Sequence, residues 1–123
     1  MLINISNHPS AKWQPHQKNM AENSYGKIFD ISFPDVPAEA DSLYILSIAR
    51  EYSQKIIALV DEYSNESKPN AVHIQGEFTL TYRIVSLLKK SGVKCIASTS
   101  KRDISEENGK KVIHFNFVQF REY

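Results

Sequence analysis

The sequence predicts one α/β domain, residues 1–123, in which helices cover both faces of a mainly parallel sheet and a C-terminal β-hairpin adds an antiparallel edge. Two patterns predict it. Short apolar segments alternate with segments whose apolar residues recur every three or four positions, and an Asn-Gly turn lies near the C-terminus. With 41% hydrophobic and 24% charged residues, the composition is that of a folded domain rather than a disordered chain.

The first part of the chain supplies two strands and a short helix. Residues 1–6 form an apolar strand that ends at the turn-rich residues 7–10. Pro15 then opens a short helix, because the missing N–H of proline costs nothing in a first helical turn. Residues 27–32 form the second strand.

A long amphipathic helix follows. Asp41 or Ser42 offers an N-cap, and between Ile45 and Tyr63 apolar residues recur at steps of three and four. This stripe predicts a helix that runs to about Asn65 and buries one face.

The second part of the chain begins with a third strand over residues 71–75. A tight turn at Gly76 leads into a helix that stops at Gly92, and residues 93–98 form a fourth strand. The elements so far alternate between strand and helix, which favours parallel pairing with the helices as crossovers.

A hairpin closes the chain. Residues 107–110 carry the Asn-Gly signal of a tight turn, and residues 111–121 form the last strand. Val118 and Phe120 break the alternation of that strand, which predicts a bulge or an edge crossing near Phe117.

Charge and cysteine content exclude several classes of protein. The 15 basic and 14 acidic side chains leave a formal net charge of +1, which argues against a whole-surface grip on long DNA or RNA. The net charge is −3 over residues 1–69 and +4 over residues 70–123, which indicates either an anion-facing side or solvated helix ends and a charged hairpin. The single cysteine, Cys95, cannot form an intramolecular disulfide, and no apolar run approaches the ~20 residues of a membrane helix. We therefore expect a cytoplasmic protein without membrane contact.

Polar loops follow all four parallel strands, at the edge where ligands of open parallel sheets bind. Gly76 would let the backbone turn sharply, and the helix after it would present free N–H groups to a phosphate. Thr79 could add a hydroxyl, while Lys101 and Arg102 could add positive charge. Alternatively, Gly76 serves only the turn and Thr79 only caps its helix. Because four polar loops share one edge, we expect a phosphate-bearing ligand.

Common cofactor motifs are absent. The chain has neither the glycine pattern of dinucleotide-binding folds nor that of P-loops. Its four histidines show no metal-ligand spacing, so we expect no metal and no cofactor. His73 lies within a predicted buried strand and is expected to be a hydrogen-bonded core or interface residue, and Cys95 a small core residue. Only His8 lies in a loop at the predicted ligand edge.

Three segments resemble the small CRISPR-associated ring nucleases. They are residues 72–78 (VHIQGEF), residues 97–102 (ASTSKR) and residues 118–123 (VQFREY). The resemblance covers roughly residues 70–123. Near the N-terminus, Ser6-Asn7-His8 is similar to the serine–histidine pair of that family, but with Asn7 inserted.

The resemblance implies a Rossmann-like fold related to the CRISPR-associated nucleotide-sensing domains, usually as a homodimer. It also implies that cyclic oligoadenylate, most often the tetra-adenylate ring, binds across the dimer two-fold. The ring would be cleaved without a metal by attack of a ribose 2′-hydroxyl, which switches off the type III CRISPR response. A module that only sequesters the ring would use the same loops, whereas an unrelated structural or interaction domain would not bind it.

The candidate residues come from these loops and this resemblance. The candidate catalytic residues are His8, Glu77, Lys101 and Arg102. The candidate ligand-binding residues are Ser6, Asn7, Ser10, Gln75, Gly76, Phe78, Thr79, Ser98, Thr99 and Ser100. An imidazole or a carboxylate would move protons, and the two cations would stabilise charge on the phosphorane. Glu77 could instead bind adenine, a 2′-hydroxyl or Arg102, or interact only with the helix dipole.

Overall fold

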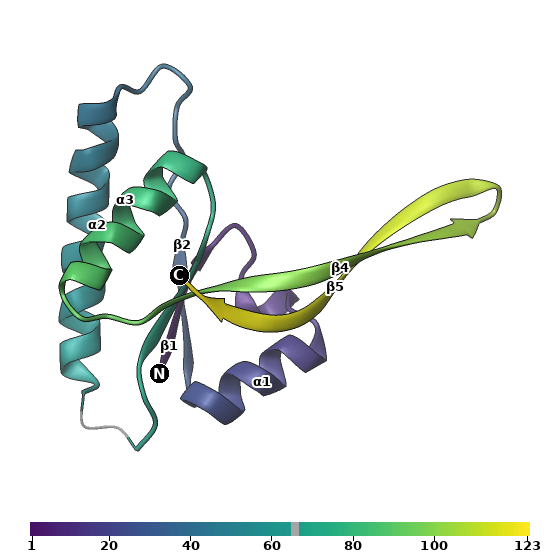
Figure 1. Cartoon of the computed structure of the whole chain (residues 1–123), viewed down its shortest axis with the longest axis horizontal. Helices are drawn as coiled ribbons and strands as arrows, with labels where there is room; N and C mark the ends of the chain where they lie inside the picture. Colours follow the sequence, from purple (N-terminus) through teal and green to yellow (C-terminus); the bar gives the residue numbers. More distant parts are fainter. Residues whose placement is uncertain (65–66) are drawn as a thin grey trace.

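In the computed structural model, which describes residues 1–64 and 67–123, five strands form one sheet in the order β2-β1-β3-β4-β5 (Figure 1). The strands are β1 (Leu2–Ser6), β2 (Ile28–Ser32), β3 (Ala71–Gln75), β4 (Cys95–Glu107) and β5 (Lys110–Glu122). The first four run parallel to their neighbours, and β5 pairs antiparallel with β4. The predicted mainly parallel, Rossmann-like α/β fold is confirmed.

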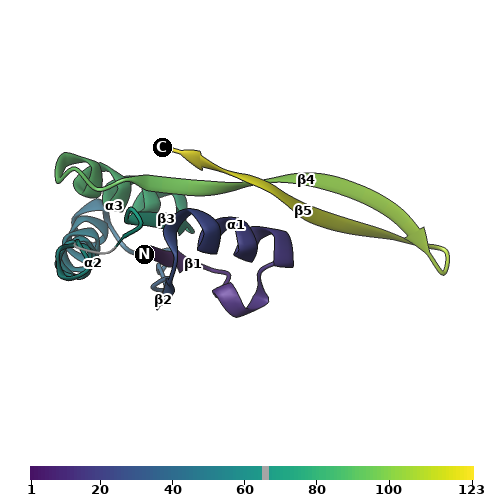
Figure 2. The same ribbon diagram turned by 90° about the horizontal axis from the view of Figure 1, so that it is seen from below.

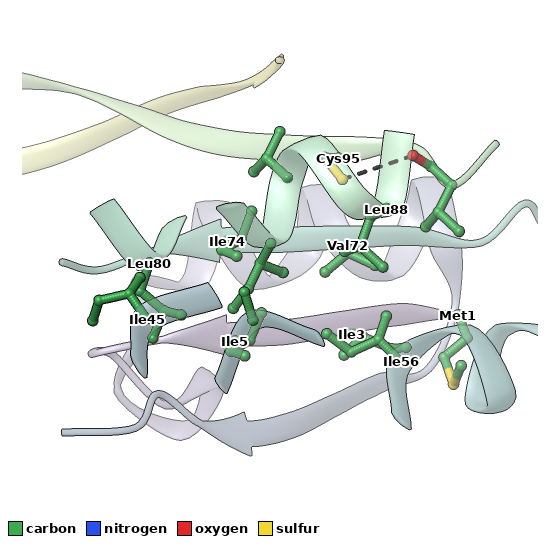
Figure 3. Packing of buried hydrophobic residues seen from close by; sticks show 14 residues of the cluster. Met1, Ile3, Ile5, Ile45, Ile56, Val72, Ile74, Leu80, Leu88 and Cys95 are labelled. Atoms are coloured by element: carbon green, nitrogen blue, oxygen red, sulfur yellow. Dashed lines mark hydrogen bonds between the residues drawn. The ribbon is translucent and has the colours of Figure 1, made fainter. Parts of the chain in front are cut away.

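Helices lie on both faces of the sheet, as predicted (Figure 2). The helices are η1 (Ser10–Lys12), α1 (Pro15–Tyr25), α2 (Ser42–Glu62) and α3 (Phe78–Lys90). One core lies under α2 and α3 and takes Ile3, Ile5 and Val72 from the sheet (Figure 3). The other lies under α1 and takes Leu2 and Ala71. Successive strand residues therefore enter opposite cores.

The helix ends follow local signals. Asp41 caps α2 by accepting a 2.8 Å hydrogen bond from the main-chain N–H of Tyr44. α2 ends at Glu62, with Tyr63 as its C-cap, before the end predicted at about Asn65, a residue that lies outside the described ranges. Gly92 has a φ of 76° just beyond the end of α3, the left-handed conformation that favours glycine at a helix stop.

Cys95 is a core residue, as expected. Its thiol lies 3.7 Å from the carbonyl oxygen of Val93, and the side chain packs under α3 (Figure 3). Burial raises the pKa of this thiol to about 11, so it carries no thiolate at neutral pH.

β4 is much longer than the predicted strand of residues 93–98. It begins at Cys95 and runs to Glu107, so residues 98–102 lie in a strand and not in the loop that the sequence predicted. β5 pairs with it from Ile96↔Glu122 to Glu107↔Lys110. This partner supplies main-chain hydrogen bonds over the whole segment, and its register is not visible in the local sequence.

The hairpin itself follows the prediction. Asn108 and Gly109 both have positive φ, 53° and 76°, as a tight two-residue turn requires. Thr99 pairs with Gln119 and Ser100 with Phe117, so one residue of β5 is extra. This is the bulge predicted near Phe117.

Beyond the bulge the hairpin projects away from the helices as a long twisted ribbon (Figures 1 and 2). We call residues 100–117 the arm and the rest of the described chain the body. No helix of the described ranges, 1–64 and 67–123, is long and apolar enough to cross a membrane.

Candidate functional site

A cleft of about 610 Å³ opens at the carboxyl ends of β1 and β3, on the α1 side of the sheet. The connections from these two neighbouring strands leave in opposite directions, the arrangement in which open α/β sheets bind ligands. The cleft is lined by Asn7, His8, Lys12, Trp13, Gln14, Gln17, His73, Gln75, Gly76, Phe78, Ser98, Thr99, Ser100, Phe115 and Phe117.

A row of polar side chains crosses the sheet beside this cleft. Asn4 lies in register with Asp30 on one side and with His73 on the other. Asn4 Nδ2 donates to Asp30 Oδ1 at 2.7 Å, and Asn4 Oδ1 lies 2.8 Å from His73 Nδ1. Asn4 and His73 are almost completely buried, so these hydrogen bonds offset the cost of placing polar groups in the core.

The row ends at Ser98. Its Oγ lies 2.7 Å from His73 Nε2 and accepts a 3.0 Å hydrogen bond from Gln17 Nε2. Since Asn4 Oδ1 can only accept, His73 Nδ1 carries the ring proton and Nε2 accepts from the Ser98 hydroxyl. Burial lowers the pKa of His73 to about 4, so the ring is neutral and weakly basic. His73 therefore orients the Ser98 hydroxyl at the cleft rather than removing its proton.

Gln75 joins β3 to β4 where their main-chain pairing stops. The last paired residues are His73 and Ile96. Beyond them the Gln75 side chain accepts from the Ser98 N–H at 3.1 Å and donates to the Ser98 carbonyl at 3.2 Å. The Gln75 amide thus takes the place of one pair of main-chain hydrogen bonds between β3 and β4. Because the main chains are no longer paired here, β4 diverges from β3 and leaves room for the cleft.

The loop after β1 is held by the main chain of His8. Its carbonyl oxygen accepts three hydrogen bonds of 3.0 Å, from Asn4 Nδ2, Ser6 Oγ and Trp13 Nε1. The His8 side chain is exposed in the cleft lining, whereas Ser6 is buried beneath the loop. Ser6 thus shapes the cleft from below.

Ser10 lies outside the cleft lining. Its N–H and hydroxyl bind the Asp30 carboxylate at 3.0 and 2.7 Å. Burial raises the pKa of Asp30, but the hydrogen bonds from Ser10 and Asn4 outweigh it, and the pKa is lower than usual. The charged Asp30 therefore fixes the start of η1.

Glu77 caps α3. Its carboxylate accepts from the Leu80 N–H at 2.8 Å, and from the N–H and hydroxyl of Thr79. The bond from Leu80, with those from Thr79, lowers the pKa of Glu77. Neither Glu77 nor Thr79 lines the cleft, so the structure places both at a helix start, one of the alternatives that the sequence left open.

Gly76 lines the cleft, and the structure gives a reason for a glycine at this position that the sequence did not show. A Cβ atom at this position would overlap the ring of Phe33, the residue that follows β2. Next to it, Phe78 is 89% exposed at the cleft. A side chain at this position would fit only if the Phe33 ring moved away.

Comparison with known proteins identifies the family. The uncharacterized protein MJ1673 family matches residues 1–121. The chain belongs to this family. No curated protein and no solved structure matches the chain. Because the family match spans body and arm alike, the polar row, the cleft and the hairpin are all parts of the matched region.

Within this MJ1673-family domain, only some of the site residues predicted on β4 line the cleft. Ser98, Thr99 and Ser100 line the cleft, whereas Lys101 and Arg102 do not. Strand alternation puts Arg102 on the face of Ser98 and Ser100, next to its cross-strand partner Phe115. Lys101 projects from the opposite face, so at most Arg102 reaches toward the cleft within one chain.

Sequence reasoning missed the contribution of η1 and α1 to the cleft. Lys12, Trp13, Gln14 and Gln17 come from this segment. Their position after the first strand, with an indole, two amides and a cation within six residues, was the signal that could have pointed to them. Among the described residues, no group of three or more His, Cys, Asp or Glu side chains could hold a metal ion.

Proposed function

We propose that this protein binds cyclic oligoadenylate in the cleft and opens the ring without a metal, the activity of the CRISPR-associated ring nucleases that its C-terminal segments resemble. The tetra-adenylate ring is the preferred substrate, and its cleavage switches off type III CRISPR signalling. The observation that carries the proposal is the composition of the cleft, which combines aromatic rings, amides, hydroxyls, an imidazole and an ammonium group.

Each part of a nucleotide finds a suitable partner there. Phe78 and Phe115 are 89% and 65% exposed and offer faces on which adenine can stack. The two amides of the cleft are held in place by hydrogen bonds. The Gln14 side chain accepts one from the main-chain N–H of Phe117 in β5, and the Gln17 side chain donates one to the Ser98 hydroxyl. Lys12 supplies a positive charge for phosphate.

Ring opening needs proton transfer and charge stabilisation. The ribose 2′-oxygen bonds to phosphorus as the 5′-oxygen leaves, which yields a 2′,3′-cyclic phosphate and a 5′-hydroxyl. His8, exposed in the cleft, takes the proton from the 2′-hydroxyl or returns one to the leaving oxygen. Lys12, which lines the cleft, stabilises the negative charge of the phosphorane.

Sequestration without cleavage is the second candidate. It is favoured by Glu77, a predicted acid–base residue whose carboxylate instead accepts hydrogen bonds at the N-terminus of α3. It is also favoured by His73, whose pKa of about 4 makes it a weak base. In this case the cleft would hold an intact ring.

The test incubates excess protein with labelled cyclic tetra-adenylate in the presence of a chelator. Linear product that ends in a 2′,3′-cyclic phosphate supports the enzyme, and retained intact ring supports sequestration. Absence of binding for every ring size overturns both.

A histidine pair provides the matched variants. Replacing His8 by alanine should slow cleavage about 10²–10⁴-fold while the ring still binds. Replacing His114, an exposed arm histidine 3.8 Å from Glu107, should leave the rate unchanged. Equal rates for both variants would remove His8 from the mechanism.

A further inference from the structure

The arm has a free edge on β4. Pairing with β3 ends at Ile96, and among the described residues only β5 bonds to the main chain of residues 100–107. A two-stranded ribbon on its own is at best marginally stable in water. Its open row of N–H and C=O groups is also a template for another strand.

The outer edge of β5 is less available. The Gln14 side chain accepts from the N–H of Phe117 at 2.8 Å and donates to the carbonyl of Phe115 at 3.3 Å. The β4 edge is the one that remains open to a second copy.

The charges along β4 are self-complementary. Residues 101–107 read Lys-Arg-Asp-Ile-Ser-Glu-Glu, with two cations before Ile104 and two anions after it. If two copies pair antiparallel about Ile104, Lys101 lies opposite Glu107 of the second copy and Arg102 opposite Glu106. Symmetry repeats both pairs, so four pairs of opposite charge flank the axis.

This register is specific. Moving the axis to Asp103 sets that carboxylate opposite its own copy. Moving it to Ser105 sets Asp103 opposite Glu107. Moving the axis by one residue shifts every pair by two residues, and both such shifts bring like charges together. A slip of the pairing by one residue would instead move the side chains of one strand to the other face of the sheet.

The apolar residues of the arm agree with the same axis. Ile104 is 61% exposed and pairs across the hairpin with Ile113, which is 46% exposed. In the paired copies, Ile104 meets its own copy, so Ile113 and Ile104 of both chains form one row across four strands. The pairing covers part of an apolar surface that the isolated arm leaves in water.

We propose that two copies of this chain join through the β4 edges of their arms, with Ile104 on the two-fold axis, as one four-stranded antiparallel sheet. Ser98 lies six residues from Ile104, about 20 Å along the strand, whereas the cleft residue Phe115 pairs with Arg102, only two residues from Ile104. The oligomeric state is measured without nucleotide, so failure of the arm dimer can be told apart from failure of the proposed function.

The test measures the oligomeric state of the full chain without nucleotide, by sedimentation at micromolar concentration. The native chain should be a dimer. The double variant K101E/R102E puts like charges in all four pairs and should raise the dissociation constant about ten-fold or more. The double variant R50E/K90E changes the exposed charges of α2 and α3 by the same amount and should remain a dimer.

A second variant separates failed pairing from a failed arm. In E106K/E107K/K110E/K111E the anions and cations facing each other across the hairpin exchange places, so opposite charges remain within the arm. Alone, it should also have a dissociation constant raised about ten-fold or more. Mixed with K101E/R102E, it again has four attractive pairs, and a heterodimer should form. A native monomer, two variants that dimerise as the native chain does, or a mixture that stays monomeric would each overturn the proposal.

Discussion

The body and the arm differ in which residues they bury: the body buries polar side chains in its sheet, and the arm leaves large apolar side chains exposed. In β1 all five residues are buried, including Asn4 and Ser6, because strands lie on both sides of it and a helix covers each face. In the arm Ile104 and Phe115 are more than half exposed, because each arm strand pairs with a neighbouring strand on one side only.

The difference bears on the proposals made for each region. In the body, the buried side chains of Asn4 and His73 bond to one another, and their row ends at Ser98, beside the cleft. In the arm, the unusual residues are apolar and exposed and lie next to an open strand edge. The body therefore carries the cleft that we propose as a small-molecule site, and the arm carries the strand edge that we propose as a contact with a second copy.

The largest expected effect is the loss of the polar row. Replacing Asn4 by alanine removes a hydrogen bond from His73 Nδ1, from Asp30 and from the His8 carbonyl in one step. At about 1–3 kcal/mol for each buried group left unsatisfied, the change should cost roughly 3–5 kcal/mol of unfolding free energy. Denaturant unfolding measures this cost. The control is Ser105→Ala on the arm, whose buried hydroxyl has no hydrogen-bond partner and whose loss should change stability by less than about 0.5 kcal/mol. Similar costs at both positions would contradict the contrast between body and arm.

Acid should weaken the body through His73. The pKa of His73 is about 4 in the fold against 6.5 for the free side chain, so between these values the unfolded chain binds more protons than the fold. Stability therefore rises with pH across this window and is lost as pH falls, by about 3 kcal/mol in all. Unfolding curves at pH 7 and near pH 4 measure the loss.

The variant His73→Gln supplies the control for this prediction. Glutamine cannot titrate, so its stability should vary less between the two pH values, whatever its starting stability. A native chain whose stability is flat from pH 6.5 to pH 4 would show that His73 is not buried as a neutral ring.

The smallest expected effect concerns Glu77. Replacing it by glutamine removes a charge at the start of α3 but keeps an oxygen that can accept from Leu80, so stability should fall by a few tenths to about 1 kcal/mol. Binding and cleavage of the ring should stay unchanged. A rate that falls while binding persists would instead make Glu77 the general base.

Local sequence determined many of the elements. The third strand was predicted at residues 71–75, where β3 lies, and Asp41, Gly92 and the Asn-Gly turn act as their residue types predict. These features depend on contacts within a few residues, such as a capping carboxylate or a positive φ. Alternating strands and helices were likewise sufficient to predict the parallel sheet.

Only the tertiary structure decided which candidate residues meet. Ser98 joins His73 because β3 and β4 pair in one particular register, and Gly76 is needed because Phe33 arrives from a different strand end. Lys101 and Arg102 leave the cleft lining because β5 extends β4 into the arm. Each outcome depends on residues far apart in the chain, whose register is set by the packing of the whole sheet and not by any local pattern.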